Sequence, residues 1–136
     1  MILTLTQIVA AKVQELLKGR LNSKILDVGC GDGLVGEALK LRGFTNLIGT
    51  DISEKMVQLA EKKNFYKTVF QADLMKPLNL ESQSFDLLTC VGVTTYLEPR
   101  VIREWCRVVT TGNRSQYPPP DVEGSKYFRR LDCIYC

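Results

Sequence analysis

The segment from Ile25 to Gly33, ILDVGCGDG, constrains the fold of this chain more than any other. A short apolar strand, interrupted only by Asp27, is followed by glycines at positions 29, 31 and 33. Glycine loses more backbone entropy on folding than any other residue. One glycine would suffice for a turn that binds nothing. Three of them predict a turn whose backbone is approached closely by a ligand.

The apolar residues that surround this segment alternate between helical and strand periodicity. We expect helices over residues 3–18, 33–42, 53–63 and 99–109, and strands over 25–28, 47–50, 68–71 and 85–93. Such alternation predicts a parallel sheet with right-handed crossovers and helices on its faces. The expected fold class is therefore α/β, a Rossmann-like three-layer αβα sandwich with a mainly parallel sheet. In this sheet ligands bind at the carboxyl ends of the strands, where the glycines lie.

Charge and cysteine content exclude several function classes. The net charge of +3 arises after Pro99, so the core is neutral and nucleic acid is not an expected partner. Five cysteines and no histidine favour reduced thiols over a disulfide framework or a metal site. The C-x-x-C pair Cys133–Cys136 is interpreted as incidental. Charged residues interrupt the N-terminal helix, which argues against a signal peptide or a membrane span. We expect a cytoplasmic protein, without excluding the nucleus.

Spacing alone leaves two ligand classes open. The residues from Gly31 to Gly36 match G-x-G-x-x-G, and Asp51 lies near the distance at which a dinucleotide-binding acid is expected. An NAD(P)-dependent oxidoreductase is therefore one alternative. However, the carboxylate of Asp27 favours a cofactor that carries an ammonium and a sulfonium over a diphosphate. Gly29 is unexplained by that fingerprint, and Asp73 could accept a hydrogen bond from a purine amine.

Three segments together resemble the class I S-adenosylmethionine-dependent methyltransferases. ILDVGCGDG is similar to the first motif of the family, and GTDISEKMVQLA to its ribose-binding strand and following helix. QADLMKPLNLESQSFDLLTCVGV is similar to the adenine-binding acid and the fourth strand. Within the class, GLVGEALKLRGFTNLIGTDIS and CVGVTTYLEP resemble the small methyltransferase-like proteins of the Williams–Beuren syndrome region. The resemblance covers residues 20–110 and implies S-adenosyl-L-methionine as cofactor.

The resemblance implies that the glycine loop holds the methionine part of the cofactor and that Asp51 holds its ribose. Gly29, Cys30 and Gly31 would line the methionine part, and Asp27 would help to orient its amino group. Asp51 would accept hydrogen bonds from the ribose hydroxyls. The competing interpretation of Asp51 is a cap of the next helix, beside Ser53, and we favour the ribose role.

The resemblance also implies that the adenine and the methyl donor meet residues of the next three strands. Ile52 and Met56 would pack on the adenine, Asp73 would meet its amine, and Leu74 would cover the ring. Cys90 would face the methyl donor. Plain core packing is an alternative for Met56, Leu74 and Cys90, and a turn role is an alternative for Asp73.

The implied function is methyl transfer from S-adenosylmethionine to an acceptor that the sequence does not identify. The segment 92–96 lacks the N/D-P-P-Y/F motif of amino-methylating nucleic-acid enzymes, which favours a small molecule. No residue stands out as a catalytic base. The alternative is a cofactor-binding relative with weak or no catalysis that acts through a partner.

The C-terminal part departs from the family. We assign residues 1–110 to the cofactor-binding core and residues 111–136 to an irregular tail that contains Pro118–Pro120. The sheet is therefore expected to be incomplete at its C-terminal end, as in a truncated or alternatively spliced form, with one added edge strand at most within residues 126–135. Otherwise the strand at 85–93 would be an exposed apolar edge, which predicts self-association or a protein partner there.

Overall fold

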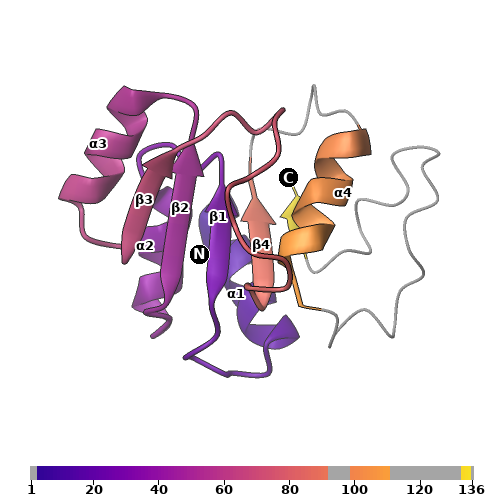
Figure 1. Ribbon diagram of the computed structural model, residues 1–136. Coiled ribbons are helices and arrows are strands. Elements are labelled where there is room, and N and C mark those ends of the chain that lie inside the picture. Colours follow the sequence, from indigo (N-terminus) through magenta and orange to yellow (C-terminus); the bar gives the residue numbers. More distant parts are fainter. Residues whose placement is uncertain (1–2, 92–98, 111–132, 136) are drawn as a thin grey trace.

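A computed structural model describes residues 3–91, 99–110 and 133–135 of the chain (Figure 1). Helices and strands alternate along the sequence, as the periodicity predicts. The elements are α1 (Leu5–Leu16), β1 (Ile25–Val28), α2 (Leu34–Leu41), β2 (Leu47–Asp51), α3 (Glu54–Lys62), β3 (Thr68–Gln71), β4 (Leu87–Cys90), α4 (Pro99–Val108) and β5 (Cys133–Tyr135). None of the described helices is long and apolar enough to span a membrane.

The strands form one parallel sheet in the order β3-β2-β1-β4-β5. In its register Val28 of β1 lies between Thr50 of β2 and Cys90 of β4. Because all strands run in the same direction, their carboxyl ends meet at one edge, at the top of the sheet in Figure 1. The predicted α/β class and the parallel sheet are confirmed.

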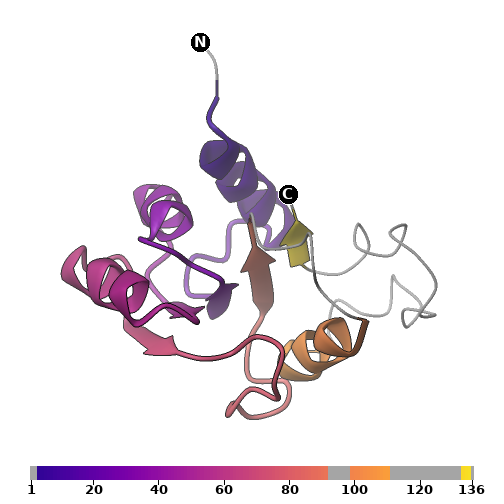
Figure 2. The same cartoon turned by 90° about the horizontal axis from the view of Figure 1, so that it is seen from above.

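Helices cover both faces of the sheet (Figure 2). Successive side chains of a strand point to opposite faces. Ile25 of β1 and Leu87 of β4 accordingly pack in a cluster with residues of α1, α2 and α3. Leu26 and Leu88 pack in a second cluster with α4 and with the β3–β4 connection. Both β1 and β4 are buried along their whole length, which explains their nearly continuous apolar sequences.

The helices begin and end at residues with clear physical reasons. Thr4 and Gln7 form a reciprocal capping box at the start of α1. The hydroxyl of Ser53 accepts a hydrogen bond from the Met56 amide, at 3.3 Å, and caps α3 as the sequence predicts. Gly43 follows α2 with a φ of 97°, and Asn64 follows α3 with a φ of 59°. Both residues tolerate the left-handed conformation that ends a helix.

The C-terminal side of the sheet differs from the sequence-based expectation. β4 is shorter than predicted, because it ends at Cys90 and residues 92–98 lie outside the described part. The one edge strand that the sequence allowed within residues 126–135 is present as β5, which pairs with β4, with Thr89 opposite Ile134. The prediction of a partner surface on an exposed edge of β4 is therefore wrong, since backbone pairing covers that edge. Residues 133–135 of the expected irregular tail form a sheet strand, while residues 111–132 and Cys136 are not described.

Candidate functional site at the carboxyl edge of the sheet

The loop between β1 and α2 turns on three glycines in the left-handed region. Gly29, Gly31 and Gly33 have φ values of 67°, 55° and 98°. Other residues adopt such values only with strain, so the backbone itself explains the pattern that the sequence analysis singled out. The amides of Cys30 and Gly33 donate to the carbonyls of Thr50 and Cys30, at 2.9 and 3.0 Å. The loop is therefore anchored to β2 and to itself.

Asp51, at the end of β2, joins the loop after β1 to the loop after β2. Its Oδ2 accepts a hydrogen bond from the Gly31 amide and its Oδ1 accepts one from the Ser53 amide, each at 2.9 Å. A carboxylate has about four acceptor sites, so these two bonds leave capacity for further donors. Asp51 is only partly buried. A Cβ placed on Gly31 would meet no heavy atom within 4 Å, so the space beside this amide is open.

The side chains that follow Asp51 are apolar and accessible. Ile52 is 61% exposed, which is unusual for a large aliphatic side chain. Met56, one turn into α3, is half-buried. An apolar surface thus lies directly after the carboxylate of Asp51.

Asp73 lies beyond the end of β3, near Asp51. The Ala72 amide donates to the Asp51 carbonyl at 3.0 Å, which brings the ends of β2 and β3 together. Asp73 is half-buried, and its Oδ1 accepts from the Met75 amide at 2.9 Å in a local turn. The next residue, Leu74, is buried and belongs to the core cluster on the α4 face. The turn role weighed for Asp73 and the core packing of Leu74 are both present.

Asp27 is buried beneath the glycine loop. It is 2% exposed, and its two oxygens accept hydrogen bonds from the hydroxyls of Tyr66, at 2.6 Å, and Thr89, at 2.9 Å. Burial raises the pKa of Asp27 to about 6, and the nearby charge of Asp51 acts in the same direction. The two hydroxyl donors oppose this rise by stabilising the charged form. Asp27 is therefore largely ionised at neutral pH.

Tyr66, just before β3, completes this network and was not singled out by the sequence analysis. Its hydroxyl donates to Asp27 and accepts from the Gly36 amide at 3.1 Å. A Cβ on Gly36 would lie 2.4 Å from Cζ of the Tyr66 ring. A Cβ on Gly33 or on Gly49 would lie 3.2 Å from other carbons of the same ring. Gly36 of the G-x-G-x-x-G match is thus explained by room for a tyrosine ring. The sequence offered one signal for this contact: Gly36 lies inside a helix and Gly49 inside a strand, and glycine at such positions indicates a large side chain packed against them.

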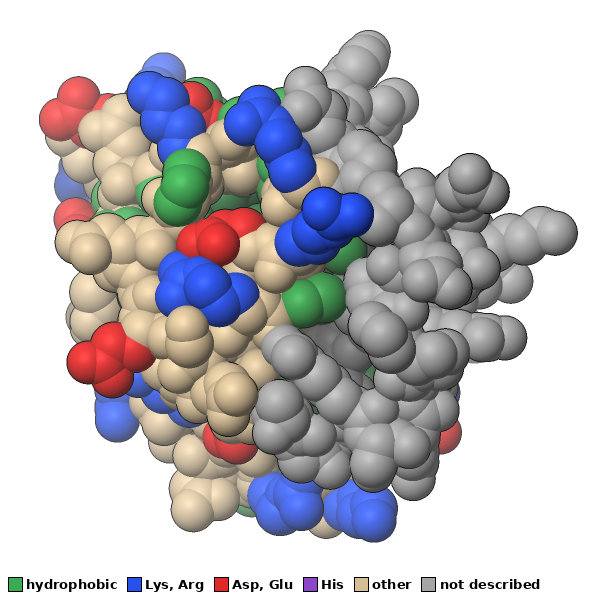
Figure 3. All heavy atoms as spheres, turned by 45° about the vertical axis from the view of Figure 1, so that its right-hand side comes forward, with side chains coloured by type: hydrophobic (Ala, Val, Ile, Leu, Met, Phe, Trp, Pro, Cys, Tyr) green, Lys and Arg blue, Asp and Glu red, His purple; other side chains and the backbone are tan. Residues whose placement is uncertain are grey.

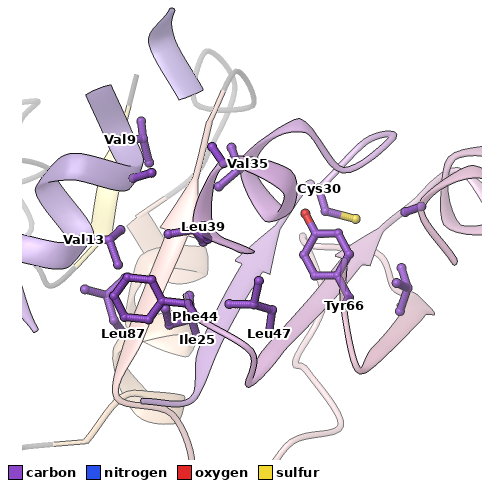
Figure 4. Close-up of a cluster of buried hydrophobic side chains, with 14 of the residues drawn as sticks. Val9, Val13, Ile25, Cys30, Val35, Leu39, Phe44, Leu47, Tyr66 and Leu87 are labelled. Atoms are coloured by element: carbon purple, nitrogen blue, oxygen red, sulfur yellow. The ribbon is translucent and has the colours of Figure 1, made fainter. Parts of the chain in front are cut away.

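The two predicted cysteines lie in the core. Figure 4 shows Cys30 beside Tyr66 in the cluster under α2 and α3. Burial raises the pKa of the Cys30 thiol to about 12, and the charge of Asp27 adds to this effect. Cys90 is fully buried in the cluster on the opposite face. The structure therefore gathers Gly29, Gly31, Asp51, Ile52 and Asp73 at one edge of the sheet, and it places the side chains of Asp27, Cys30, Leu74 and Cys90 behind that edge.

Comparisons with known proteins identify the family of this chain. A family model described as "Methyltransferase domain" matches residues 26–114. A ubiquinone biosynthesis O-methyltransferase of Coxiella burnetii is 30% identical over 106 residues, which cover 74% of this chain and 44% of that protein. The corresponding protein of Pseudomonas syringae is 32% identical over 100 residues, which cover 67% and 41%. The chain thus spans less than half the length of these curated relatives.

Solved structures of methyltransferases are among those that resemble this chain. The S-adenosylmethionine-dependent methyltransferase from Mesorhizobium loti has a TM-score of 0.62 at 28% identity and is aligned over 74% of this chain and 48% of its own. The magnesium protoporphyrin IX methyltransferase of Synechocystis, solved with bound S-adenosylhomocysteine, has a TM-score of 0.61 at 26% identity, over 76% and 51%.

Proposed function

Because the chain belongs to the class I S-adenosylmethionine-dependent methyltransferase superfamily, through its methyltransferase domain, we propose that it binds S-adenosylmethionine at the carboxyl edge of the sheet. We further propose that it contributes to methyl transfer to a small molecule. The observation that carries this proposal is the carboxylate of Asp51, held between the amides of Gly31 and Ser53 beside open space. A carboxylate in that position suits the two hydroxyls of a ribose.

The charges at this edge suit a cationic ligand. Asp51 lies close enough to Asp27 for its charge to raise the pKa of Asp27. Two neighbouring carboxylates would repel a pyrophosphate and attract the ammonium and sulfonium of S-adenosylmethionine. Since both oxygens of Asp27 have hydroxyl donors, we propose that its charge, more than direct contact, acts on the cofactor.

The adenine has an apolar and a polar neighbour in this proposal. The exposed side chain of Ile52 would cover one face of the adenine ring. The bound ligand would remove the apolar surface of Ile52 from water, which favours binding. Asp73 would accept a hydrogen bond from the exocyclic amine. Met56, half-buried in α3, would complete the apolar contact.

Catalysis in this site depends on positioning. The bound cofactor supplies a methyl group already activated by its positive sulfur. The residues of the chain orient it and align it with the acceptor, which is catalysis by proximity. The chain has no histidine, and Cys30 stays protonated because its pKa is about 12. The named relatives include a ubiquinone biosynthesis O-methyltransferase and a magnesium protoporphyrin IX methyltransferase, which supports a small-molecule acceptor here.

Thermal denaturation in the presence of candidate ligands tests the proposal. S-adenosylmethionine and S-adenosylhomocysteine should raise the melting temperature, whereas NAD and NADP should not. At a concentration 100-fold above Kd, a ligand adds about 2.7 kcal/mol to the free energy of unfolding. A rise with NAD alone would contradict the proposal.

Substitution of Asp51 gives the sharper test. Asp51→Asn should weaken binding of S-adenosylhomocysteine about tenfold to a hundredfold, because charge-assisted hydrogen bonds contribute roughly 1.5–3 kcal/mol. Calorimetric titration measures this difference. Asp32→Asn is the matched control: it removes the same charge from the neighbouring loop, where Asp32 pairs with Lys63 at 3.0 Å. Equal affinities of the two variants would count against a ribose role for Asp51.

A further inference from the structure

The β3–β4 connection, residues 72–86, has no helix of its own, yet it is held firmly against α4. This segment carries Asp73 at its beginning and covers the sheet beside α4 (Figure 1). Its far end is fixed by main-chain bonds: the Gln83 and Phe85 amides donate to the carbonyls of Arg107 and Val108, at 2.8 and 2.9 Å. Its middle is fixed by two side chains of α4.

Arg107 makes most of these side-chain contacts. Its Nη1 donates to the Leu80 carbonyl at 2.9 Å and to the Ser82 hydroxyl at 3.0 Å. Its Nη2 donates to the Leu78 carbonyl at 3.0 Å. One guanidinium thus binds three successive parts of a segment that lacks regular hydrogen bonding. Lysine carries its three donors on one nitrogen and lacks the planar fork of a guanidinium.

Glu104, one turn earlier on α4, completes the arrangement. Its Oε1 accepts from the Leu78 amide at 2.9 Å and from Nη2 of Arg107 at 2.6 Å, and its Oε2 accepts from Nε of Arg107 at 3.0 Å. Both polar groups of the Leu78 backbone are therefore bound by this pair. The guanidinium beside Glu104 holds the pKa of that carboxyl below its usual range. Figure 3 shows basic and acidic side chains close together on the surface of the molecule.

The backbone that the pair holds, at Leu78, lies five residues after Asp73, the residue expected to meet the adenine. Leu74 and Leu78 are both buried against α4, in one cluster with Trp105. The Lys76 amide donates to the Asp73 carbonyl at 3.1 Å and forms a turn between the two leucines. With Leu78 fixed by hydrogen bonds and Leu74 fixed by packing, little freedom remains for Asp73.

We propose that Glu104 and Arg107 are positioning residues that set the selectivity of the site for adenine, because they hold the segment from which Asp73 reaches the ligand. The inference rests on the proposed function, since it assumes that Asp73 accepts from the adenine amine. Neither residue touches the cofactor in this account. They act through the backbone of residues 74–82.

A comparison of two ligands tests the inference. S-adenosylhomocysteine carries the exocyclic amine, whereas S-inosylhomocysteine carries a carbonyl oxygen in its place. The parent chain should prefer the adenine compound, and Arg107→Gln should reduce that preference roughly tenfold. Asp73→Asn should reduce it similarly, and the double variant should lose no more than Asp73→Asn alone. A merely structural role would weaken both ligands equally and leave their ratio unchanged.

Arg103→Gln provides the matched control, because it removes the same charge from an exposed position of the same helix. It should keep the selectivity of the parent chain. If Arg107→Gln does not fold, Arg107→Lys replaces it and should also lose selectivity. Hydrogen exchange at the Leu78 amide is a second readout and should be faster in either variant.

The outcomes separate the two proposals. If neither nucleoside binds the parent chain, the proposed function fails. If both bind and the ratio of their affinities is the same in the parent and in the Arg107 variant, the proposed function stands and the inference about Glu104 and Arg107 is overturned.

Discussion

At the residue scale, the buried carboxylate of Asp27 is the most consequential group. The sequence shows an acid before the glycines, but it does not predict what surrounds that acid in the folded chain. Tyr66 and Thr89 are 39 and 62 positions away in the chain, so only the folded sheet brings their hydroxyls to Asp27. The family resemblance also implied cofactor contact for Cys30. Its side chain lies in the core. Sequence periodicity does not indicate which way a side chain in a loop points.

The raised pKa of Asp27 predicts a specific pH dependence of stability. With a pKa of about 6 in the folded chain and 3.8 as its ordinary value, folding is favoured when this group is protonated. The contribution of Asp27 to the free energy of unfolding is complete below pH 4 and is lost as the pH rises through 6. The free energy of unfolding falls by about 3 kcal/mol over this range. Asn at this position has no charge, and it can accept from one hydroxyl through Oδ1 and donate to the other through Nδ2.

Urea denaturation of the parent and of Asp27→Asn, between pH 4 and 7, measures that difference. The free energy of unfolding of the variant, relative to that of the parent, should rise across this interval. A constant difference would show that Asp27 has an ordinary pKa in the folded chain.

At the scale of elements, helices and internal strands were predicted to within about two residues at most ends. Their apolar periodicity and their caps, such as Ser53, are local properties that a sequence displays directly. β4 and β5 were predicted less well. β5 has three residues and exists through its pairing with Thr89 and its neighbours, which is a long-range contact that no local pattern encodes.

Helix α2 offers a test of how tightly its face meets Tyr66. Replacement of glycine by alanine inside a helix usually stabilises it by about 1 kcal/mol. For Gly36→Ala we expect the opposite sign, a loss of roughly 1–3 kcal/mol, because the new methyl would lie 2.4 Å from the tyrosine ring. Chemical denaturation measures it, with Glu37→Ala on the exposed face of α2 as the control. A more stable Gly36→Ala would mean that the ring moves aside.

At the scale of the whole molecule, the two core clusters share the strands of one sheet. Residues 25 and 26 of β1 belong to different clusters, as do residues 87 and 88 of β4. The layered fold follows from this alternation and was predictable from sequence. The strand order and the route of residues 72–86 depend on which faces pack together, which periodicity leaves open.

The shared strands predict cooperative unfolding, and Trp105 can report it. This single tryptophan is fully buried in the cluster on the α4 face. Its fluorescence in urea should change at the same midpoint as the far-ultraviolet circular dichroism, which follows all helices. The emission maximum should move to longer wavelength on unfolding. An earlier fluorescence transition would show that α4 detaches before the rest of the sheet unfolds.

The ring of Tyr66 ties together positions that evolution would otherwise vary independently. Gly33, Gly36 and Gly49 come from a loop, a helix and a strand, and each leaves space for the same aromatic group. Any lineage that enlarges one of these glycines must shrink or reorient the aromatic side chain, and a smaller group at 66 would leave a void beneath the loop. Mutational tolerance at these four sites is therefore a joint property, and their substitutions should be epistatic.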